Sequence, residues 1–557
     1  MASIRSRISD IVLDRRILFL GAAFLAMWVA ILPGGLPLLN QPQETPRLVV
    51  ILVVDQLRAD YLTTYAHRWR SGFRTLIAEG AYFPRAEYPY LTTLTCAGHA
   101  TIATGTFPRT HGMILNRWWH RDEQRTWNCA DDEATQPVTY GGPAKLGSSG
   151  KRLLVPTLAD QIRAQKPGAR VVSISLKARS AIGLAGHGGT AVTWLDEEGR
   201  TFVTSRAFAS GPVEEVRAFI EQDNFARDQE RNWTLQVRDT TYRYPDLDDT
   251  ERPRAGWTAL FPHPLAGLRG ADSQFILRWQ RSPFSDAYLG RMAAALADAY
   301  ELGRRDTTDY LAVSFSALDM LAHDFGPQSR EVEDHLMQLD ATLGVLIQHL
   351  DDTVGRDRYV LALTADHGVA DTPKQADSGQ IYEDDVLPLV ERVLVSHWGT
   401  RPDGPYVASV SVGDIYFAPA IFDRLRADPR VLQAVENALL ATPGVSRVLR
   451  GDRLSDTDPD PVVRTAALGY VAGRSGDLIL VTRQNWMMGL RANNYATSHG
   501  TMYDYDRQVP IVFLGPAFKP GRYTLVVTPA DIAPTLALLA GVTMPKAEGS
   551  AVRPALK

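Results

Sequence analysis

Five apolar runs recur along the chain, and a charged residue or a glycine follows each of them. They stand in LVVILVVDQ (48–56), VVSISLKAR (171–179), YLAVSFSALD (310–319), YVLALTADHG (359–368) and VPIVFLG (509–515). Runs rich in Val, Leu and Ile predict strands that are buried on both faces of a parallel sheet. Ligands bind outside the carboxyl ends of such strands, so we expect the functional residues at that edge.

Amphipathic helices are predicted between these strands. Residues 286–305 and 329–352 carry apolar side chains at three- and four-residue spacing, which gives each helix one apolar face. Strands that alternate with helices in this order indicate an α/β fold. We therefore predict a three-layer α/β/α sandwich with a mostly parallel central sheet.

Two long segments, about 195–280 and 374–490, interrupt this alternation. The first is rich in charged residues, proline and tryptophan, and the second contains short strands and helices of its own. We interpret both as inserted cap segments beside the active-site cleft of one catalytic domain that spans 46–545. A single α/β domain with long insertions reaches this length.

Residues 1–39 have the pattern of an export signal. An uncharged run over 17–32 is followed by proline and glycine, and its 16 residues span roughly 24 Å as a helix. This is shorter than the roughly 30 Å hydrocarbon core of a bilayer. A cleaved signal peptide and an uncleaved inner-membrane anchor both stay open, and either predicts a periplasmic or extracellular protein. Four arginines precede the run: Arg5, Arg7, Arg15 and Arg16.

Charge and cysteine content narrow the classes of partner. A net charge of -4 gives no global basic field for nucleic acid or anionic lipid, and no protein partner is inferred.

The two cysteines, Cys96 and Cys129, are too few for a disulfide scaffold and lack the Cys-x-x-Cys spacing of a structural zinc site. They either form one bridge or are two unrelated small buried residues.

Acidic and histidine side chains follow the predicted strands. Asp319 and His323 are four residues apart, so on a helical turn they lie on one face. Such a pair suits one metal ion, and it is also common as an ordinary pair on a helix surface. Asp366 and His367 stand side by side at the end of a strand, before a glycine that permits a sharp turn.

Two more residues complete a ligand set of six. Asp55 ends the first strand, and His499 lies in a Thr-Ser-His-Gly sequence. The set then contains three carboxylates and three imidazoles, a mixture that suits zinc, whereas calcium and magnesium prefer shells of oxygen alone. Two ions with three ligands each would keep open positions for a substrate.

Several motifs in one order resemble the alkaline phosphatase superfamily. They include VVDQLRADYL, TCAGHATIATG, SISLKAR, ALDMLAHDFGP, TADHG and SHGT, within about 48–542. The pattern is similar in particular to that of the phosphate-irrepressible phosphatases of the PafA/PhoK type and of their relatives, the nucleotide pyrophosphatase/phosphodiesterases. The resemblance implies two Zn²⁺ ions per chain. The implied ligands are Asp319, His323 and His499 for one ion and Asp55, Thr95, Asp366 and His367 for the other.

The resemblance also implies that Thr95 is the nucleophile and forms a phospho-threonine intermediate. Its hydroxyl stands three residues before Gly98-His99, the offset found in the family. The family positions that match His99 and His111 are structural, so we expect hydrogen-bonded histidines there. Three nearby threonines stay open as alternatives on the residues alone: Thr92, Thr93 and Thr101.

Three residues are implied to contact the phosphoryl group: Asn116, Lys177 and Arg179. The pair Lys177 and Arg179 matches the monoesterases of the family, and the diesterases lack it. A monoester carries about two negative charges and needs such cations. We therefore predict a zinc-dependent alkaline phosphatase that hydrolyses small phosphate monoesters with broad specificity. The alternative is a nucleotide pyrophosphatase/phosphodiesterase on the same two-zinc core.

Two interpretations of other classes fit the residues less well. A phosphoglycerate mutase-like isomerase on the same metal core conflicts with the export signal, and a catalytically silent binding protein would not keep six ligands and a nucleophile. Cys96 lacks the Cys-x-Pro-x-Arg context of a sulfatase. The sequence predicts neither the physiological substrate nor an additional structural Ca²⁺.

Overall fold

The computed structural model describes residues 45–557 except 197–200, 247–248, 267–273 and 375–376. The predicted export signal over 1–39 therefore lies outside the described residues. Among the described helices, none combines the length and the apolar character that a membrane span requires.

A ten-stranded sheet forms the centre of the domain. Its five middle strands, from β12 to β7, run parallel, and further strands on both sides add antiparallel pairs. Every residue of β1 is buried, as the continuous apolar run predicts. In spatial order the strands are β20 (Gly521–Arg522), β2 (Ala81–Glu87), β19 (Gln508–Leu514), β12 (Tyr359–Thr364), β1 (Leu48–Val54), β11 (Asp309–Phe315), β6 (Val171–Ser175), β7 (Ala191–Asp196), β8 (Thr201–Ser205) and β5 (Pro137–Thr139).

Strand β19 differs from the expectation that all five apolar runs end at the site edge. It pairs antiparallel with both β12 and β2, so its amino end lies at that edge. The chain reaches β19 from the loop of His499 through the short helix α17 (Asp504–Arg507). Because this loop already lies at the site edge, the strand that follows must run away from it.

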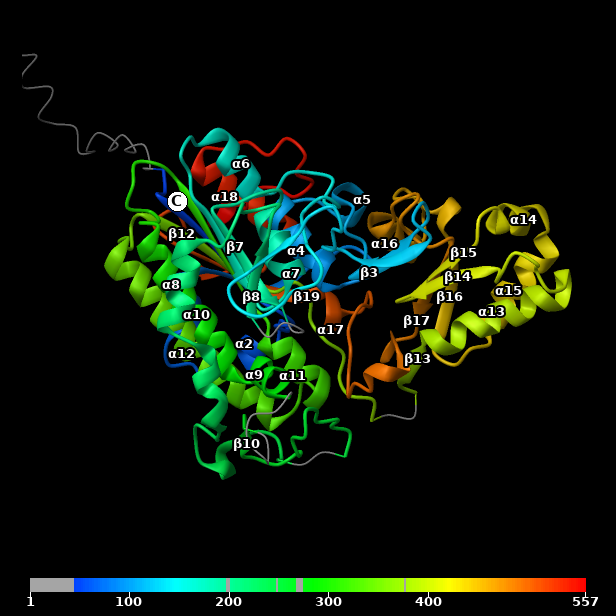
Figure 1. Cartoon of the computed structure of the whole chain (residues 1–557), viewed down its shortest axis with the longest axis horizontal. Coiled ribbons are helices and arrows are strands. Elements are labelled where there is room, and N and C mark those ends of the chain that lie inside the picture. The colour runs from blue at the N-terminus through cyan, green and yellow to red at the C-terminus, as the bar shows by residue number, and fades with distance from the viewer. Residues whose placement is uncertain (1–44, 197–200, 247–248, 267–273, 375–376) are drawn as a thin grey trace, which may run out of the picture. The chain divides into compact units, whose positions relative to one another are not determined.

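Helices cover both faces of the sheet, which confirms the three-layer sandwich (Figure 1). The predicted helices over 286–305 and 329–352 correspond to α10 and α12. One layer contains α4 (Thr95–Thr104), α6 (Leu158–Gln165), α7 (Ala178–Ala185) and α18 (Ile532–Ala540). The other contains α3 (Gly72–Glu79), α8 (Glu214–Gln222), α10 (Pro283–Ala299), α11 (Ala317–Phe325) and α12 (Arg330–Thr353). Shorter helices are α2 (Tyr61–Thr64), α5 (Pro108–His111) and α9 (Phe275–Gln280).

The segment from β13 (Gly379–Tyr382) to β18 (Trp486–Gly489), here called the cap, has a sheet and an apolar core of its own. Its core contains Val390, Leu394, Val435 and Leu478. The cap appears in yellow and orange in Figure 1. Its sheet contains β14 (Val407–Ser411), β15 (Asp414–Phe417), β17 (Leu478–Thr482) and β16 (Val445–Arg450), and β13 (Gly379–Tyr382) pairs with β18 (Trp486–Gly489). Its helices are α13 (Glu383–Trp398), α14 (Ile421–Ala427), α15 (Pro429–Leu440) and α16 (Pro461–Gly469).

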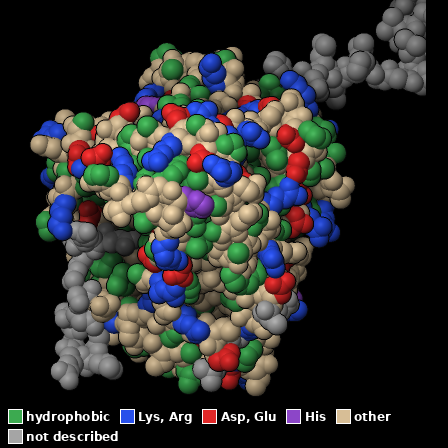
Figure 2. Space-filling model, turned by 90° about the vertical axis from the view of Figure 1, so that its right-hand side faces the viewer, with side chains coloured by type: hydrophobic (Ala, Val, Ile, Leu, Met, Phe, Trp, Pro, Cys, Tyr) green, Lys and Arg blue, Asp and Glu red, His purple; other side chains and the backbone are tan. Residues whose placement is uncertain are grey.

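The surface on the cap side carries charges of both signs. In Figure 2, Lys and Arg side chains alternate with Asp and Glu side chains over the face shown, and the described part of this face has no broad patch of one sign. This distribution agrees with the small net charge of the sequence.

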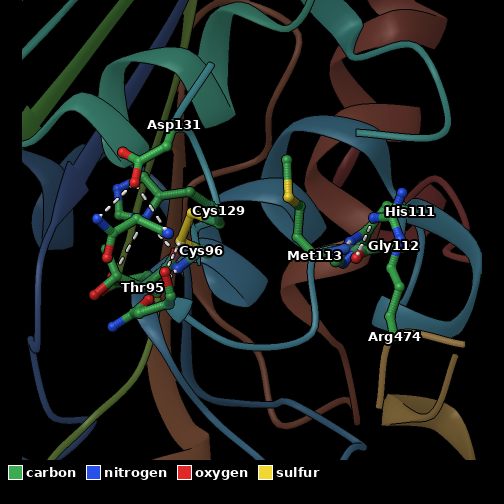
Figure 3. The surroundings of a disulfide bond; sticks show 12 residues. Thr95, Cys96, His111, Gly112, Met113, Cys129, Asp131 and Arg474 are labelled. Atoms are coloured by element: carbon green, nitrogen blue, oxygen red, sulfur yellow. Dashed lines mark hydrogen bonds and ion pairs between the residues drawn. A yellow bond between two sulfur atoms is a disulfide. The ribbon is translucent and has the colours of Figure 1, made fainter. Parts of the chain in front are cut away.

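A disulfide joins Cys96 to Cys129, so the two cysteines form the bridge that the sequence left open. Cys96 lies in the first turn of α4, next to Thr95, and Cys129 follows the hairpin of β3 (Arg117–His120) and β4 (Arg125–Asn128) (Figure 3). Asn116 lies between them: its side-chain oxygen accepts from the Cys96 amide at 2.9 Å and its carbonyl from the Cys129 amide at 2.9 Å. The bridge thus ties the hairpin to the start of α4.

Loss of this bridge should destabilise the protein. A crosslink between residues 33 positions apart restricts the unfolded chain, and we expect the Cys96→Ser/Cys129→Ser double variant to lose about 2–4 kcal/mol of unfolding free energy. Urea unfolding of both proteins at one metal concentration measures the loss. Dithiothreitol should shift the wild type toward the variant and leave the variant unchanged, and equal midpoints without reductant would contradict the expectation.

Candidate active site

The carboxyl ends of three adjacent strands form the base of the site. In the parallel register, Val54 of β1 pairs with Phe315 of β11, and Val53 pairs with Thr364 of β12. The residues that follow these strands therefore emerge side by side. They supply Asp55 after β1, Asp319 and His323 from α11 after β11, and Asp366 and His367 after β12, while His499 comes from the loop before α17.

Asp55, Asp366 and His367 form a first group of donors. One ligand atom of each lies within 4.8 Å of the others, and all three residues are fully buried. Nε2 of His367 is 3.6 Å from Oδ1 of Asp55 and 3.4 Å from Oδ2 of Asp366. These are the three residues that the resemblance assigns to one metal ion.

Asp319 is the centre of a second group. Its Oδ1 is 3.3 Å from Nε2 of His323 and 3.6 Å from Nε2 of His499. The ring of His499 stacks on that of His367, with centroids 3.5 Å apart, and His367 also lies within 4.8 Å of the donors of Asp319 and His499. The two groups are therefore adjacent, and all six predicted ligands gather in one place.

The three imidazoles share one orientation. In each of them Nδ1 lies at hydrogen-bond distance from a backbone carbonyl oxygen, which can only accept, so Nδ1 carries the hydrogen. Nε2 then presents its lone pair toward the carboxylate oxygens at 3.3–3.6 Å, where two lone pairs repel unless a cation lies between them. The Nδ1 contacts are His323 to Thr497 at 2.8 Å, His367 to Gly368 at 2.9 Å and His499 to Thr93 at 3.0 Å.

The charges of the site also favour bound cations. Oδ1 of Asp55 and Oδ2 of Asp366 are buried and accept no hydrogen bond from a described residue. Burial raises the pKa of Asp55 well above its usual value, the carboxylate of Asp366 adds to the rise, and Lys177 opposes it. Nζ of Lys177, 2.6 Å from Asp55 and 2.5 Å from Asp319, is one positive charge beside three carboxylates. A donor set of buried carboxylates and imidazoles fits metal ions of the zinc type.

Of the four candidate threonines, Thr95 is the one whose hydroxyl contacts a histidine of these two groups. It opens α4, it is 1% exposed, and its Oγ1 is 3.5 Å from Nε2 of His367. Thr93 donates to the carbonyl of Thr501, and Thr101 contacts Tyr90 and His111. Thr92 lines a separate small pocket against the cap.

His99 and His111 are hydrogen-bonded histidines, as expected. Burial lowers the pKa of His111 to about 3, so its ring stays neutral between the Thr101 hydroxyl and the Met113 amide. His99 contacts the Thr95 carbonyl at 2.9 Å through Nδ1, which is also 3.2 Å from Oδ2 of Asp366. His99 therefore links the start of α4 to a candidate ligand.

Gly98 allows α4 to approach Asp366 closely. A Cβ atom at this position would lie 2.2 Å from the carbonyl oxygen of Asp366. Real Cβ atoms do not approach backbone so closely, so any side chain here would push Thr95 and Asp366 apart.

A cavity of about 410 Å³ opens above the donors. Thr95, Asn116, Lys177 and Arg179 all line it. The side-chain oxygen of Asn116 is held by the Cys96 amide, so its NH₂ group remains available to donate. Lys177 lies among the candidate ligands, whereas Nε of Arg179 is buried without a hydrogen-bond partner among the described residues. The predicted phosphoryl contacts thus line one cavity together with Thr95.

Gln56 is a site residue that the sequence reasoning missed. Its Nε2 donates to Oδ1 of Asp319 at 2.7 Å, and its backbone amide donates to Oδ1 of Asp366 at 3.1 Å. It has a φ of 70°, in the left-handed region that few non-glycine residues adopt. Its position directly after Asp55 at a strand end was the one available signal.

Comparison with known proteins gives matches that span most of this chain. A sequence profile of the type I phosphodiesterase / nucleotide pyrophosphatase family matches residues 49–503. Alkaline phosphatase PhoK of Sphingomonas sp is 30% identical over 538 residues, which cover 90% of this chain and 89% of that protein. A protein of Myroides odoratus named calcium-transporting ATPase is 30% identical over 522 residues, 91% of this chain and 94% of its own.

The likeness extends to three dimensions. The crystal structure of wild-type alkaline phosphatase PafA matches with a TM-score of 0.84 and 27% sequence identity. The match covers 93% of this chain and all of that one, so it includes the cap as well as the central sheet.

Removal of one ligand should lower the metal content. We expect Asp366→Asn to bind at least one divalent ion fewer per chain than the wild type, because a carboxylate that supplies charge to the first group becomes a neutral amide. Elemental analysis after gel filtration measures the content. Asp371→Asn is the matched control, since Asp371 is exposed and pairs with Arg58. An unchanged content in Asp366→Asn would contradict this assignment.

Proposed function

The chain belongs to the type I phosphodiesterase / nucleotide pyrophosphatase family and is an alkaline phosphatase of the PafA type, and we propose that it works with two zinc ions and a phosphorylated Thr95. It is a phosphoric monoester hydrolase. The proposal concerns the metal, the residues and the breadth of substrates, which we take to be monoesters of varied structure.

The orientation of the three imidazoles carries the proposal. Each Nδ1 binds a backbone carbonyl, and each Nε2 faces a carboxylate. Asp319, His323 and His499 would hold one zinc ion, and Asp55, Asp366 and His367 the other. When bound, the two ions would act as Lewis acids that favour the deprotonated hydroxyl and stabilise the departing oxygen.

Thr95 is the proposed nucleophile. Its hydroxyl loses its proton, and its oxygen forms a bond to phosphorus while the bond between phosphorus and the ester oxygen breaks; the departing oxygen takes up a proton and leaves as the alcohol. The oxygen of a water molecule then forms a bond to phosphorus while the bond between phosphorus and the Thr95 oxygen breaks, so that phosphate is released and a water proton restores the Thr95 hydroxyl. The dipole of α4 favours negative charge at its first residue, and the Asn116 amide donates to a phosphoryl oxygen.

Lys177 and Arg179 favour a monoester over a diester. A monoester has one more charged oxygen, and a guanidinium with an unpartnered buried Nε offers it a charge-assisted hydrogen bond. The nucleotide pyrophosphatase/phosphodiesterase alternative shares the same donor set. The two cations that line the same cavity as Thr95 are the observation that favours the monoesterase.

Export is a further part of the proposal. The arginine-flanked apolar run within 1–39 supports it. The disulfide between Cys96 and Cys129 supports it as well, because disulfides persist in oxidising compartments.

Two chromogenic esters test the function. We expect purified protein with zinc to hydrolyse para-nitrophenyl phosphate faster than bis-para-nitrophenyl phosphate by orders of magnitude in kcat/KM, and to lose both activities after metal removal. Thr95→Ala should abolish the monoesterase while it keeps its metal content. A preference for the diester would move the protein to the phosphodiesterase alternative.

Arg179 should contribute specifically to monoester hydrolysis. A hydrogen bond to a charged group contributes about 1.5–3 kcal/mol, so Arg179→Gln should lower kcat/KM for the monoester roughly 10- to 100-fold and change the diester less. Arg117→Gln is a useful comparison, because Arg117 also lines the cavity but already pairs with Glu383 at 2.6 Å. Equal losses for both esters would argue against this role.

A further inference from the structure

A second group of polar side chains lines the cavity beside His323. The ring of Tyr495 stacks on the ring of His323, with centroids 4.3 Å apart and planes at 17°. The guanidinium of Arg254 lies over the Tyr495 ring, 4.6 Å from its centroid. All three residues line the cavity. Arg254 is therefore separated from a candidate metal ligand by one aromatic ring.

The charges of the described residues around Arg254 do not cancel. Nε of Arg254 is 3.0 Å from Oδ1 of Asp324, and Nε of Arg281 is 2.7 Å from Oδ2 of the same carboxylate. Asp324 is fully buried, and both arginines line the cavity. In the part of the chain that the structure describes, two guanidinium groups thus share one carboxylate, which leaves one positive charge in excess.

The two described carboxylates that line the cavity do not neutralise this charge. Asp319 belongs to the candidate ligands and contacts Lys177, and Glu383 pairs with Arg117 at 2.6 Å. The ion pair of Arg254 uses Nε, so its terminal amino groups can still bind an anion. A guanidinium recognises a carboxylate or phosphate through two parallel hydrogen bonds.

We propose that Arg254 and Arg281 bind an anionic group on the leaving group, so that the enzyme favours monoesters whose alcohol carries a second negative charge. Tyr495 is a positioning residue, because both faces of its ring are covered, by His323 and by Arg254. The inference rests on the proposed function: the Thr95 oxygen lies beside His367, so the ion that Asp319, His323 and His499 would hold is the one that would stabilise the departing oxygen. The substrates that this subsite would favour are phosphate monoesters whose alcohol carries a carboxylate or a second phosphate.

Two matched esters test the subsite with the zinc-loaded enzyme. Phenyl phosphate and 4-carboxyphenyl phosphate differ by one charge on the leaving group, and the measured quantity is the ratio of their kcat/KM values. We expect Arg254→Gln to lower the ratio of the charged to the uncharged ester roughly 5- to 20-fold, the effect of one charge-assisted contact at a partly exposed site. The small difference in leaving-group basicity cancels, because it is the same for both proteins.

Variants of neighbouring residues separate recognition from structure. Arg252→Gln, at an exposed position two residues earlier, should leave the ratio unchanged. Arg254→Lys should restore part of the ratio, because lysine returns the positive charge but lacks the planar guanidinium that donates two parallel hydrogen bonds. An unchanged ratio in Arg254→Gln would overturn the proposal, and so would an equal fall of both esters.

Binding without turnover provides an independent readout. Phenylphosphonate and 4-carboxyphenylphosphonate cannot be hydrolysed, and calorimetry should show that Arg254→Gln weakens the second more than the first. If both phosphonates bind and Arg254→Gln weakens both equally or weakens neither, the subsite is wrong and the proposed function stands. If the enzyme hydrolyses neither ester, the proposed function fails and the subsite fails with it.

Discussion

The contact between imidazole Nε2 atoms and carboxylate oxygens is the constraint on which the site depends. Buried lone pairs 3.3–3.6 Å apart are unfavourable without a cation, and the fold must hold them there. The parallel order β12-β1-β11 does so, because the three strands end at one edge and deliver Asp55, Asp319 and Asp366 side by side. Backbone carbonyls then fix each ring by its other nitrogen. The sheet thus sets the positions of the candidate carboxylate ligands, and the backbone carbonyls set the orientation of the imidazole rings.

Much of this was predictable because buried parallel strands and amphipathic helices leave strong patterns. The apolar runs of β1, β6, β11 and β12, the helices α10 and α12 and the family motifs all lie within single short segments. The direction of β19 was not predictable, since an apolar run is the same in either direction. Contacts between distant segments left no local signal either. Gln56 bridges two candidate ligands that follow different strands, and Tyr495 contacts Arg254 although 241 positions separate them along the chain. The cysteine pairing depended on the hairpin that carries Cys129 folding back onto α4.

The polar side chains that line the cavity come from separate parts of the chain. Asn116, Lys177 and Arg179, the proposed phosphoryl contacts, lie beside the disulfide and at the start of α7. Arg254 and Arg281, the proposed contacts to the leaving group, and Tyr495 lie on segments outside the central strands. In the proposed function, the donor set is the part that the phosphodiesterase alternative shares. We therefore expect differences in specificity to arise from these lining side chains, which can change without any change in the candidate ligands.

The cap has its own apolar core, distinct from that of the central sheet, although Glu383, Val412 and Met488 of the cap line the cavity. Val390 and Leu478 pack in the core of the cap and not in that of the central sheet, so we expect substitutions there to disturb the cap before the strands that precede Asp55 and Asp366. The wall of the cavity that the cap provides can therefore change its side chains without displacing the candidate ligands. Such changes would alter which leaving groups fit the cavity and would keep the chemistry of the donor set in place.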